Sequence, residues 1–290
     1  MIAFNAFGPT TKTQGEAVSD QQRKFEQFKE LHQRSSTFVI PNPWDAGSAR
    51  LLTSLGFEAL ATTSAGYAFS QGKRDSLTGL SRDEILKNAA EIVAATHLPV
   101  SADLGNGFGA AAETCAQTIR MACAVGLVGG SIEDATGDPD APIFELAHAV
   151  DRIKAAAEAA RELPFVLTAR AENYLYGREN LDDTIKRLQA FSEAGADVLY
   201  APGLPDIESI RAVCQALDKP VNVVMGLKGP TYSLSELQDA GVRRISVGGS
   251  MARAALGGLM RAAEEVRTSG TFTYAADALP GTVIATFVTE

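Results

Sequence analysis

The 290-residue sequence predicts a (β/α)8 TIM barrel, an α/β fold in which eight parallel strands are surrounded by helices. Eight short apolar runs rich in β-branched residues alternate with eight segments whose apolar residues recur at helical spacing. The strand-like runs are almost continuously apolar, as expected for a parallel sheet that is covered on both faces. Because 46% of the residues are hydrophobic, the chain can bury a large core.

The expected elements follow one another in a regular order. The strands are expected at 38–41, 59–64, 99–103, 130–133, 165–170, 197–201, 220–225 and 244–248. The helices between and after them are expected at 46–55, 81–96, 110–125, 144–161, 181–194, 207–217, 233–240 and 251–267. An amphipathic helix is also expected at 21–34, where Phe25, Phe28 and Leu31 recur at three-residue steps.

Both ends of the chain lie outside this repeat. Residues 1–20 are rich in Thr, Gly and Asn, and we expect a flexible N-terminal arm there. Residues 21–290 are expected to form one barrel domain with a C-terminal extension, because no linker-like stretch divides them. The extension, 270–290, contains Ile284, Phe287 and Val288, and we expect these apolar side chains to pack on a neighbouring surface, in this subunit or another.

Charge and composition exclude several classes of partner. The formal net charge is −9 and there is no basic cluster, which argues against nucleic acid and anionic membranes but leaves small anionic substrates open. No apolar run is long enough to span a bilayer, and residues 1–20 lack the features of a signal peptide. The three cysteines show no metal-type spacing. These features predict a cytoplasmic protein.

Acidic side chains gather where catalytic residues of barrels are found, at the C-terminal ends of strands. The third strand ends at Asp103, the fourth ends at Glu133, and Asp75 lies in the loop after the second. Three converging carboxylates repel one another unless a cation lies among them, and oxygen-only ligands suit Mg²⁺ or Mn²⁺. Arg170, at the end of the fifth strand, has a planar fork that fits a substrate carboxylate, with an ion pair to Glu172 or Glu133 as the alternative role.

Two other motifs suggest different chemistry. Residues 105–110 fit the dinucleotide pattern G-x-G-x-x-A after a strand. However, Asp103 would lie beside the pyrophosphate, and this unit is third in a series of eight. Lys228 suggests a Schiff-base aldolase, but its loop looks exposed and the chemistry needs a desolvated lysine.

Several segments together resemble the isocitrate lyase/phosphoenolpyruvate mutase superfamily over residues 22–268. The matching segments are 43–50 (PWDAGSAR), 63–66 (TSAG), 102–103 (AD), 107–109 (GFG), 132–134 (IED) and 168–172 (TARAE). Members of this superfamily make or break C–C or P–C bonds beside a 2-oxo acid with the help of Mg²⁺, which stabilises the enolate.

The resemblance implies a role for each matching position. The metal and its waters would be held by Asp103, Glu133 and Asp75. The substrate would be bound by Trp44, Asp45, Ser64, Ala65, Gly66, Arg170 and Asn222, and the catalytic groups would be Arg170, Asp75 and Tyr67. Members exchange their last barrel helix between subunits, so a homo-oligomer, dimer or tetramer, is expected.

The sequence departs from the superfamily in two places. The third strand reads Ser101-Ala102-Asp103 where the superfamily has Asp-Ala-Asp, so one carboxylate is missing. The loop after the fourth strand contains neither the lyase motif, whose cysteine protonates the departing enolate, nor the lysine and asparagine of the phosphonate mutases. We expect residues 135–142 to form a lid without a thiol, with the proton supplied by a metal-bound water, Asp138, Asp140 or Tyr67.

The sequence thus predicts a Mg²⁺-dependent lyase or hydrolase. It would cleave a C–C bond beside the 2-oxo or 2-hydroxy group of a small dicarboxylate. A P–C bond enzyme acting on a phosphonopyruvate-type substrate is an alternative, as is a non-catalytic protein that binds an oxo acid.

Overall fold

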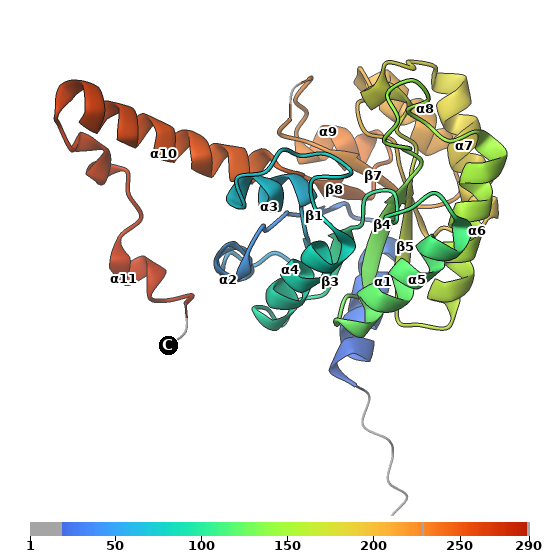
Figure 1. Ribbon diagram of the computed structural model, residues 1–290, viewed down its shortest axis with the longest axis horizontal. Helices are drawn as coiled ribbons and strands as arrows, with labels where there is room; N and C mark the ends of the chain where they lie inside the picture. The colour runs from blue at the N-terminus through green and yellow to red at the C-terminus, as the bar shows by residue number, and fades with distance from the viewer. Residues whose placement is uncertain (1–18, 228, 289–290) are drawn as a thin grey trace, which may run out of the picture.

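The computed structural model describes residues 19–227 and 229–288 and confirms the (β/α)8 barrel (Figure 1). All seven strand ladders are parallel, in the order β1-β8-β7-β6-β5-β4-β3-β2. Between β1 and β2 the barrel closes through the Ala61 N–H, which donates to the Pro41 carbonyl at 3.0 Å. The strands are β1 (Phe38–Ile40), β2 (Leu60–Ala61), β3 (Val100–Asp103), β4 (Gly129–Glu133), β5 (Val166–Arg170), β6 (Val198–Tyr200), β7 (Val221–Val224) and β8 (Arg244–Ser246).

Every expected helix is present, with ends that differ by one to a few residues. The helices are α1 (Asp20–Gln33), α2 (Ala46–Ser54), α3 (Ser64–Ser70), α4 (Arg82–Ala94), α5 (Ala112–Ala124), α6 (Leu146–Arg161), α7 (Leu181–Glu193), α8 (Ile207–Ala216), α9 (Leu234–Asp239), α10 (Ser250–Ser269) and α11 (Gly281–Ile284). Two short 3₁₀ helices are η1 (Asn173–Tyr176) and η2 (Thr273–Ala276). Side-chain caps fix several starts, including the capping boxes at Asp45, Ser81 and Ser233.

The second strand differs from the prediction. It ends at Ala61 instead of continuing to Ser64, and the next residues form the unpredicted helix α3. Thr63 causes the change, because its side-chain oxygen accepts a hydrogen bond from the Gly66 N–H at 3.2 Å and caps the new helix. Ser64, Ala65 and Gly66 therefore lie in a helical turn rather than on a strand.

The N-terminal helix α1 closes the base of the barrel. Phe28 and Leu31 are buried against the first residues of several strands. Arg244 is buried inside the barrel, and its Nη1 lies 3.2 Å from His32 Nε2. Because an arginine can only donate, this ring nitrogen is the acceptor. The proton of the ring is therefore on Nδ1, which donates to the Phe28 carbonyl at 2.7 Å. Burial lowers the pKa of His32 to about 3, so the ring is neutral.

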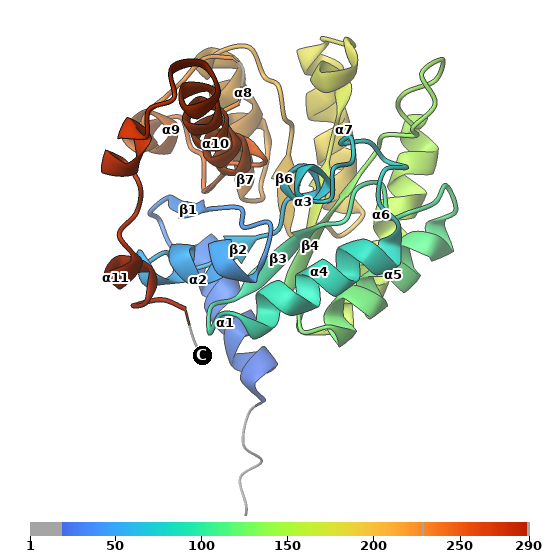
Figure 2. The same ribbon diagram turned by 60° about the vertical axis from the view of Figure 1, so that its left-hand side comes forward.

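The chain after β8 leaves the barrel, and this includes α10, which the sequence predicted as the eighth surrounding helix. Helix α10 projects away from it, and Figures 1 and 2 show the chain returning through η2 and α11. Ala252 is the one buried residue of α10, while Leu256, Leu259 and Met260 of the same helix are 45%, 67% and 62% exposed. Near the end of the extension, Phe287 lines a shallow hollow together with residues of α1, α2 and α4.

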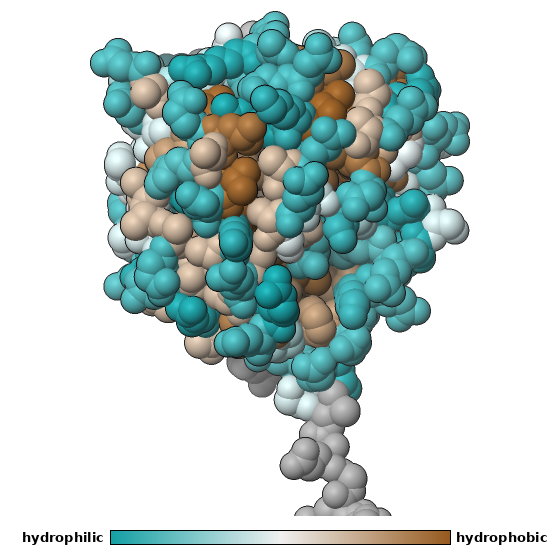
Figure 3. Space-filling view, turned by 90° about the vertical axis from the view of Figure 1, so that its right-hand side faces the viewer, coloured by the Kyte–Doolittle hydropathy of each residue, from teal (hydrophilic) through white to brown (hydrophobic). Residues whose placement is uncertain are grey.

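The outer surface is mostly polar where the helices face solvent. Hydrophilic residues cover most of the face in Figure 3, the side on which α6 and α7 lie in Figure 1. Within residues 19–227 and 229–288, no helix has the length and apolar character needed to cross a membrane. The predicted arm falls largely on residues 1–18, which lie outside the described residues.

Candidate active site

A cavity of about 550 Å³ opens at the C-terminal ends of the strands. It is lined by the start of α3, by the loop that carries Asp75, and by residues at the ends of β3 to β8. This is the end at which barrel enzymes assemble their active sites. Among the residues that the structure describes, the charged side chains on its wall are Asp75, Asp103, Glu133, Arg170, Glu172 and Arg253.

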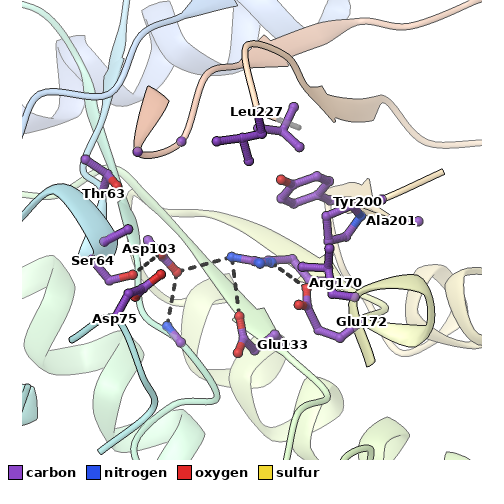
Figure 4. Close-up of a pocket in the computed structure, with 18 of the residues that line it drawn as sticks. Thr63, Ser64, Asp75, Asp103, Glu133, Arg170, Glu172, Tyr200, Ala201 and Leu227 are labelled. Carbon is purple, nitrogen blue, oxygen red and sulfur yellow. Dashed lines mark hydrogen bonds and ion pairs between the residues drawn. The ribbon is translucent and has the colours of Figure 1, made fainter. Parts of the chain in front are cut away.

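Arg170 lies at the centre of the acidic side chains (Figure 4). Its Nη1 is 3.3 Å from Asp103 Oδ1 and 3.3 Å from Glu133 Oε2, and its Nε donates to Glu172 Oε1 at 2.9 Å. Its guanidinium carbon is 5.0 Å from the ring centre of Tyr200, within the range of a cation–π contact. No hydrogen bond from Nη2 to another described residue is present, so this nitrogen can still bind a ligand.

Burial disfavours the charged forms of the carboxyl groups in the cavity. Burial raises the pKa of Glu133 well above its usual value and also raises that of Glu172, although Arg170 opposes both shifts. Burial and the charge of Asp103 raise the pKa of Asp75. Burial alone would lower the pKa of Arg170, but the surrounding carboxylates outweigh it and keep the guanidinium charged. The described residues on the cavity wall thus carry four carboxyl groups and two guanidinium groups, and of the two arginines Arg170 contacts the acids.

The turn after β3 holds Asp103 in place. Asp103 Oδ2 accepts from Ser64 Oγ at 2.6 Å, and Oδ1 accepts from the Gly105 N–H at 3.3 Å. Gly107 has φ 76°, and a Cβ there would lie 2.8 Å from Cys115 Sγ, so only glycine fits. This turn leaves the acid at the cavity wall.

A buried arginine beneath the turn connects β3 to β4. Arg152, 1% exposed, donates to the carbonyls of Asn106, Gly109 and Glu133. The carbonyls of Asn106 and Gly109 thus accept from a side chain of α6, and the unit is the third of a closed barrel rather than the first of a doubly wound sheet. The dinucleotide alternative therefore has no structural support. The Schiff-base alternative rests on Lys228, which lies outside the described residues.

Asp134 connects the ends of β4 and β5. Its Oδ1 accepts from the Glu172 N–H at 2.8 Å, and its Oδ2 lies 3.2 Å from Arg187 Nη1. Burial raises the pKa of Asp134 to about 6. This buried pair supports the backbone that carries Glu133, Arg170 and Glu172 from behind the cavity.

Comparison with known proteins identifies the family. The family model described as phosphoenolpyruvate phosphomutase matches residues 28–267. The chain belongs to this family. Its predicted membership of the isocitrate lyase/phosphoenolpyruvate mutase superfamily is thereby confirmed, as is the prediction of an enzyme of this lyase type.

Three individual relatives of this family member are informative. The chain is 29% identical to 2-methylisocitrate lyase of Escherichia coli (strain K12), covering 74% of this chain and 75% of the relative. It is 26% identical to 2,3-dimethylmalate lyase of Eubacterium barkeri, and the match covers 74% of this chain and 76% of that relative. A protein of Burkholderia cenocepacia J2315, whose crystal structure is named only as that of a lyase/mutase without a stated reaction, is 59% identical in sequence to this chain. The two structures align with a TM-score of 0.90 over 92% of this chain and 96% of the other.

The donor set of this family member fits a hard divalent cation. Asp75, Asp103 and Glu133 offer carboxylate oxygens to one cavity, and burial raises the pKa values of Asp75 and Glu133, so a bound cation would favour their charged forms. In the part of the chain that the structure describes, no three His, Cys, Asp or Glu side chains are arranged to ligate one ion. Mg²⁺ commonly uses one or two carboxylates and keeps several waters, so this arrangement suits it.

The structure brings six of the predicted site residues together. Those that line the cavity are Ser64, Ala65, Asp75, Asp103, Glu133 and Arg170. Four others are used elsewhere: Asp45 caps α2, Gly66 donates its N–H to Thr63, the Trp44 carbonyl accepts from Asn88 of α4, and Asn222 donates to Ser246 Oγ and accepts from Arg244 inside the barrel. Tyr67 does not line the cavity, and burial together with the charges of Glu91 and Glu84 of α4 raises its pKa.

Other cavity residues were not singled out from the sequence. Tyr200 ends β6, Tyr176 lies in η1, and Arg253 lies in the first turns of α10. Tyr200 could have been found by extending the strand-end argument to the sixth strand. Arg253 follows the last strand at a distance that no strand-end argument covers.

The expected lid forms a small hairpin. Ala135 and Ile143 pair as an antiparallel bridge, and Thr136 bonds within the loop to the carbonyls of Pro142 and Ala141. Asp138 and Asp140 are exposed at its tip and do not line the cavity. None of the three cysteines lines the cavity either.

Proposed function

We propose that this family member is a Mg²⁺-dependent lyase or hydrolase. It would cleave a C–C bond beside the 2-oxo or 2-hydroxy group of a small dicarboxylate. The observation that carries the proposal is the arrangement of Asp75, Asp103 and Glu133 around Arg170 in one cavity at the barrel mouth. The reactions named for two relatives, 2-methylisocitrate lyase and 2,3-dimethylmalate lyase, support this reaction class.

The side chains divide the work between binding and charge control. Arg170 Nη2 would bind the carboxylate next to the oxo group, while its other nitrogens stay on the acids. The backbone at Ser64 and Ala65 would complete this subsite. Arg253 lines the cavity and forms no ion pair with another described residue, so it would bind the second carboxylate.

The metal site would use Asp103 and Glu133, with Asp75 holding a metal-bound water. When bound, Mg²⁺ supplies Lewis-acid stabilisation of the negative charge that develops on the oxo oxygen. The ring of Tyr200, which the guanidinium of Arg170 covers, would help to hold that guanidinium in position. Its own pKa is raised to about 12 by burial, so the phenol stays neutral beside the acids.

The test is an Asp103→Ala variant assayed with a panel of 2-oxo and 2-hydroxy dicarboxylates. The account predicts loss of Mg²⁺-dependent turnover with an unchanged far-UV CD spectrum, because Asp103 lies at the mouth and supports no core. Asp151→Ala, an exposed acid on α6, is the matched control and should keep full turnover. Full turnover of the native protein in EDTA would refute the proposal.

A further inference from the structure

The wall of the cavity changes character from one side of the barrel to the other. The carboxyl groups lie on the side of β3 to β5 and in the loop of Asp75. The opposite side includes apolar residues after β6, on α8, and on and after β7, which we call the apolar wall: Ala201, Leu204, Ile210, Val223, Met225 and Leu227. Between Tyr200 and Tyr232, none of the described residues that line the cavity is charged. In Figure 4, Leu227 and Ala201 lie across Arg170 from Asp75 and Glu133.

The apolar wall is part of the barrel core and is therefore preformed. Ala201, Ile210 and Val223 are buried core residues, and Leu204 and Met225 pack against the same core. Leu227 forms the rim and is 41% exposed, and on the rim at η1 Leu175 and Tyr176 are 55% and 40% exposed. Large apolar side chains exposed around a concave site are typical of a surface that a ligand covers.

The cavity is larger than an unsubstituted dicarboxylate requires. A four-carbon 2-oxo dicarboxylate has nine non-hydrogen atoms and fills at most roughly 270 Å³, at ~30 Å³ for each water-sized group. Mg²⁺ and the waters that it keeps would take roughly another 120 Å³, at ~30 Å³ for each of four groups, which leaves roughly 160 Å³ of the 550 Å³ for a substituent. Ordered water is a poor filling for that space, because a buried water needs two to four polar partners and the wall offers no polar side chains.

We propose that the substrate carries an apolar substituent larger than a methyl group, which binds against the apolar wall. The substituent would be a linear alkyl or benzyl group on the carbon beyond the oxo or hydroxyl group. This inference rests on the proposed function, because Arg170 and the acids fix the end of the molecule from which the substituent extends. It adds a selectivity that the acidic half of the cavity cannot provide.

Oxamate and its N-alkyl derivatives test the inference without turnover, since they present a carboxylate and an oxo group but no C–C bond to cleave beyond it. Isothermal titration calorimetry in the presence of Mg²⁺ should show Kd falling about fourfold for each added methylene, because burial of one CH₂ contributes ~0.8 kcal/mol to the binding free energy. From N-methyl- to N-propyloxamate, Kd should therefore fall about 16-fold. A Kd that is constant or rises along the series overturns the inference, as does failure of every oxamate to bind.

A matched pair of variants locates the effect. Leu227→Ser should reduce the methyl-to-propyl gain to about fourfold or less, because the rim loses its apolar contact. Leu234→Ser, on α9 and outside the cavity, has a similar native exposure of 47% and should keep the full gain. Equal gains in both variants would overturn the assignment to the apolar wall.

The two proposals fail in different ways. Cleavage of unsubstituted dicarboxylates together with a flat oxamate series would overturn the apolar substituent and leave the lyase function standing. Affinity that rises with chain length, but without cleavage of any acid, would support the apolar wall and refute the lyase function.

Discussion

Replacement of Arg170 by glutamine tests how the acidic cluster is held together. The native guanidinium lies within 3.3 Å of Asp103 and Glu133 and within 2.9 Å of Glu172, and its side chain is only 14% exposed. Arg170→Gln removes the cation but leaves the buried carboxyl groups without a partner. Loss of one partner of a buried ion pair typically costs about 3–5 kcal/mol, so the free energy of unfolding should fall by that amount. The melting temperature should fall by roughly 6–20 °C.

Mg²⁺ should restore part of this loss in the variant. An ion at 100 times its Kd adds about 2.7 kcal/mol to the stability of the folded state, and the unpaired carboxylates should bind it at least as well as the native site does. Chemical denaturation of Arg170→Gln with EDTA and with Mg²⁺ measures the recovery. The matched control is Arg187→Gln, which breaks the pair with Asp134 behind the cavity, where the native arginine is 9% exposed. Both variants keep the proposed metal ligands, so Mg²⁺ should stabilise the control by the same amount as the native protein, and Arg170→Gln, whose carboxylates have lost their cation, by more. Equal gains in stability in the two variants, or no gain in either, would refute the reasoning.

Three further predictions concern other parts of the chain. Iodoacetamide should leave turnover nearly unchanged because no cysteine lines the cavity, and rapid inactivation that oxaloacetate prevents would show a thiol in the site. His32 has a pKa near 6.5 in the unfolded chain and a pKa of about 3 in the folded chain, so only the unfolded chain binds a proton between these values. The free energy of unfolding should therefore fall as the pH drops from 6.5 towards 3, by up to ~1.4 kcal/mol per pH unit. His32→Gln should flatten that slope in urea titrations, and an identical slope would contradict the assignment. The exposed Leu259 and Met260 on α10 predict a homo-oligomer that Leu259→Asp weakens, and light scattering that finds a native monomer at micromolar concentration would disprove it.

Periodicity and strand direction made the barrel and the centre of its acidic cluster predictable from the sequence. Asp103, Glu133 and Arg170 end three consecutive strands, and parallel strands bring their carboxyl ends to the same mouth. Helix α3 was missed because seven residues are too few for a periodic pattern, although Thr63 is a recognisable cap.

The residues that the structure uses elsewhere share a reason. Asn222 is the second residue of β7 and lies inside the barrel, two residues before the strand ends. Tyr67 follows Ser64 by three residues, but it does not line the cavity. Position in a motif did not fix the direction of these side chains. Conversely, Arg152 reads as a solvent-facing helix residue, yet it is fully buried, because its partners are carbonyls that only the folded turn presents.

The most direct measurement of the central claim is product analysis with the native protein. Purified protein with Mg²⁺ is incubated with alkylated and unsubstituted 2-oxo and 2-hydroxy dicarboxylates and with a phosphonopyruvate, and the mixtures are analysed by mass spectrometry. The account predicts that one or more dicarboxylates split into two smaller acids whose carbon atoms add up to the substrate, and that EDTA or Asp103→Ala abolishes this. Conversion of the phosphonate alone, or binding of the acids without any cleavage, would contradict it.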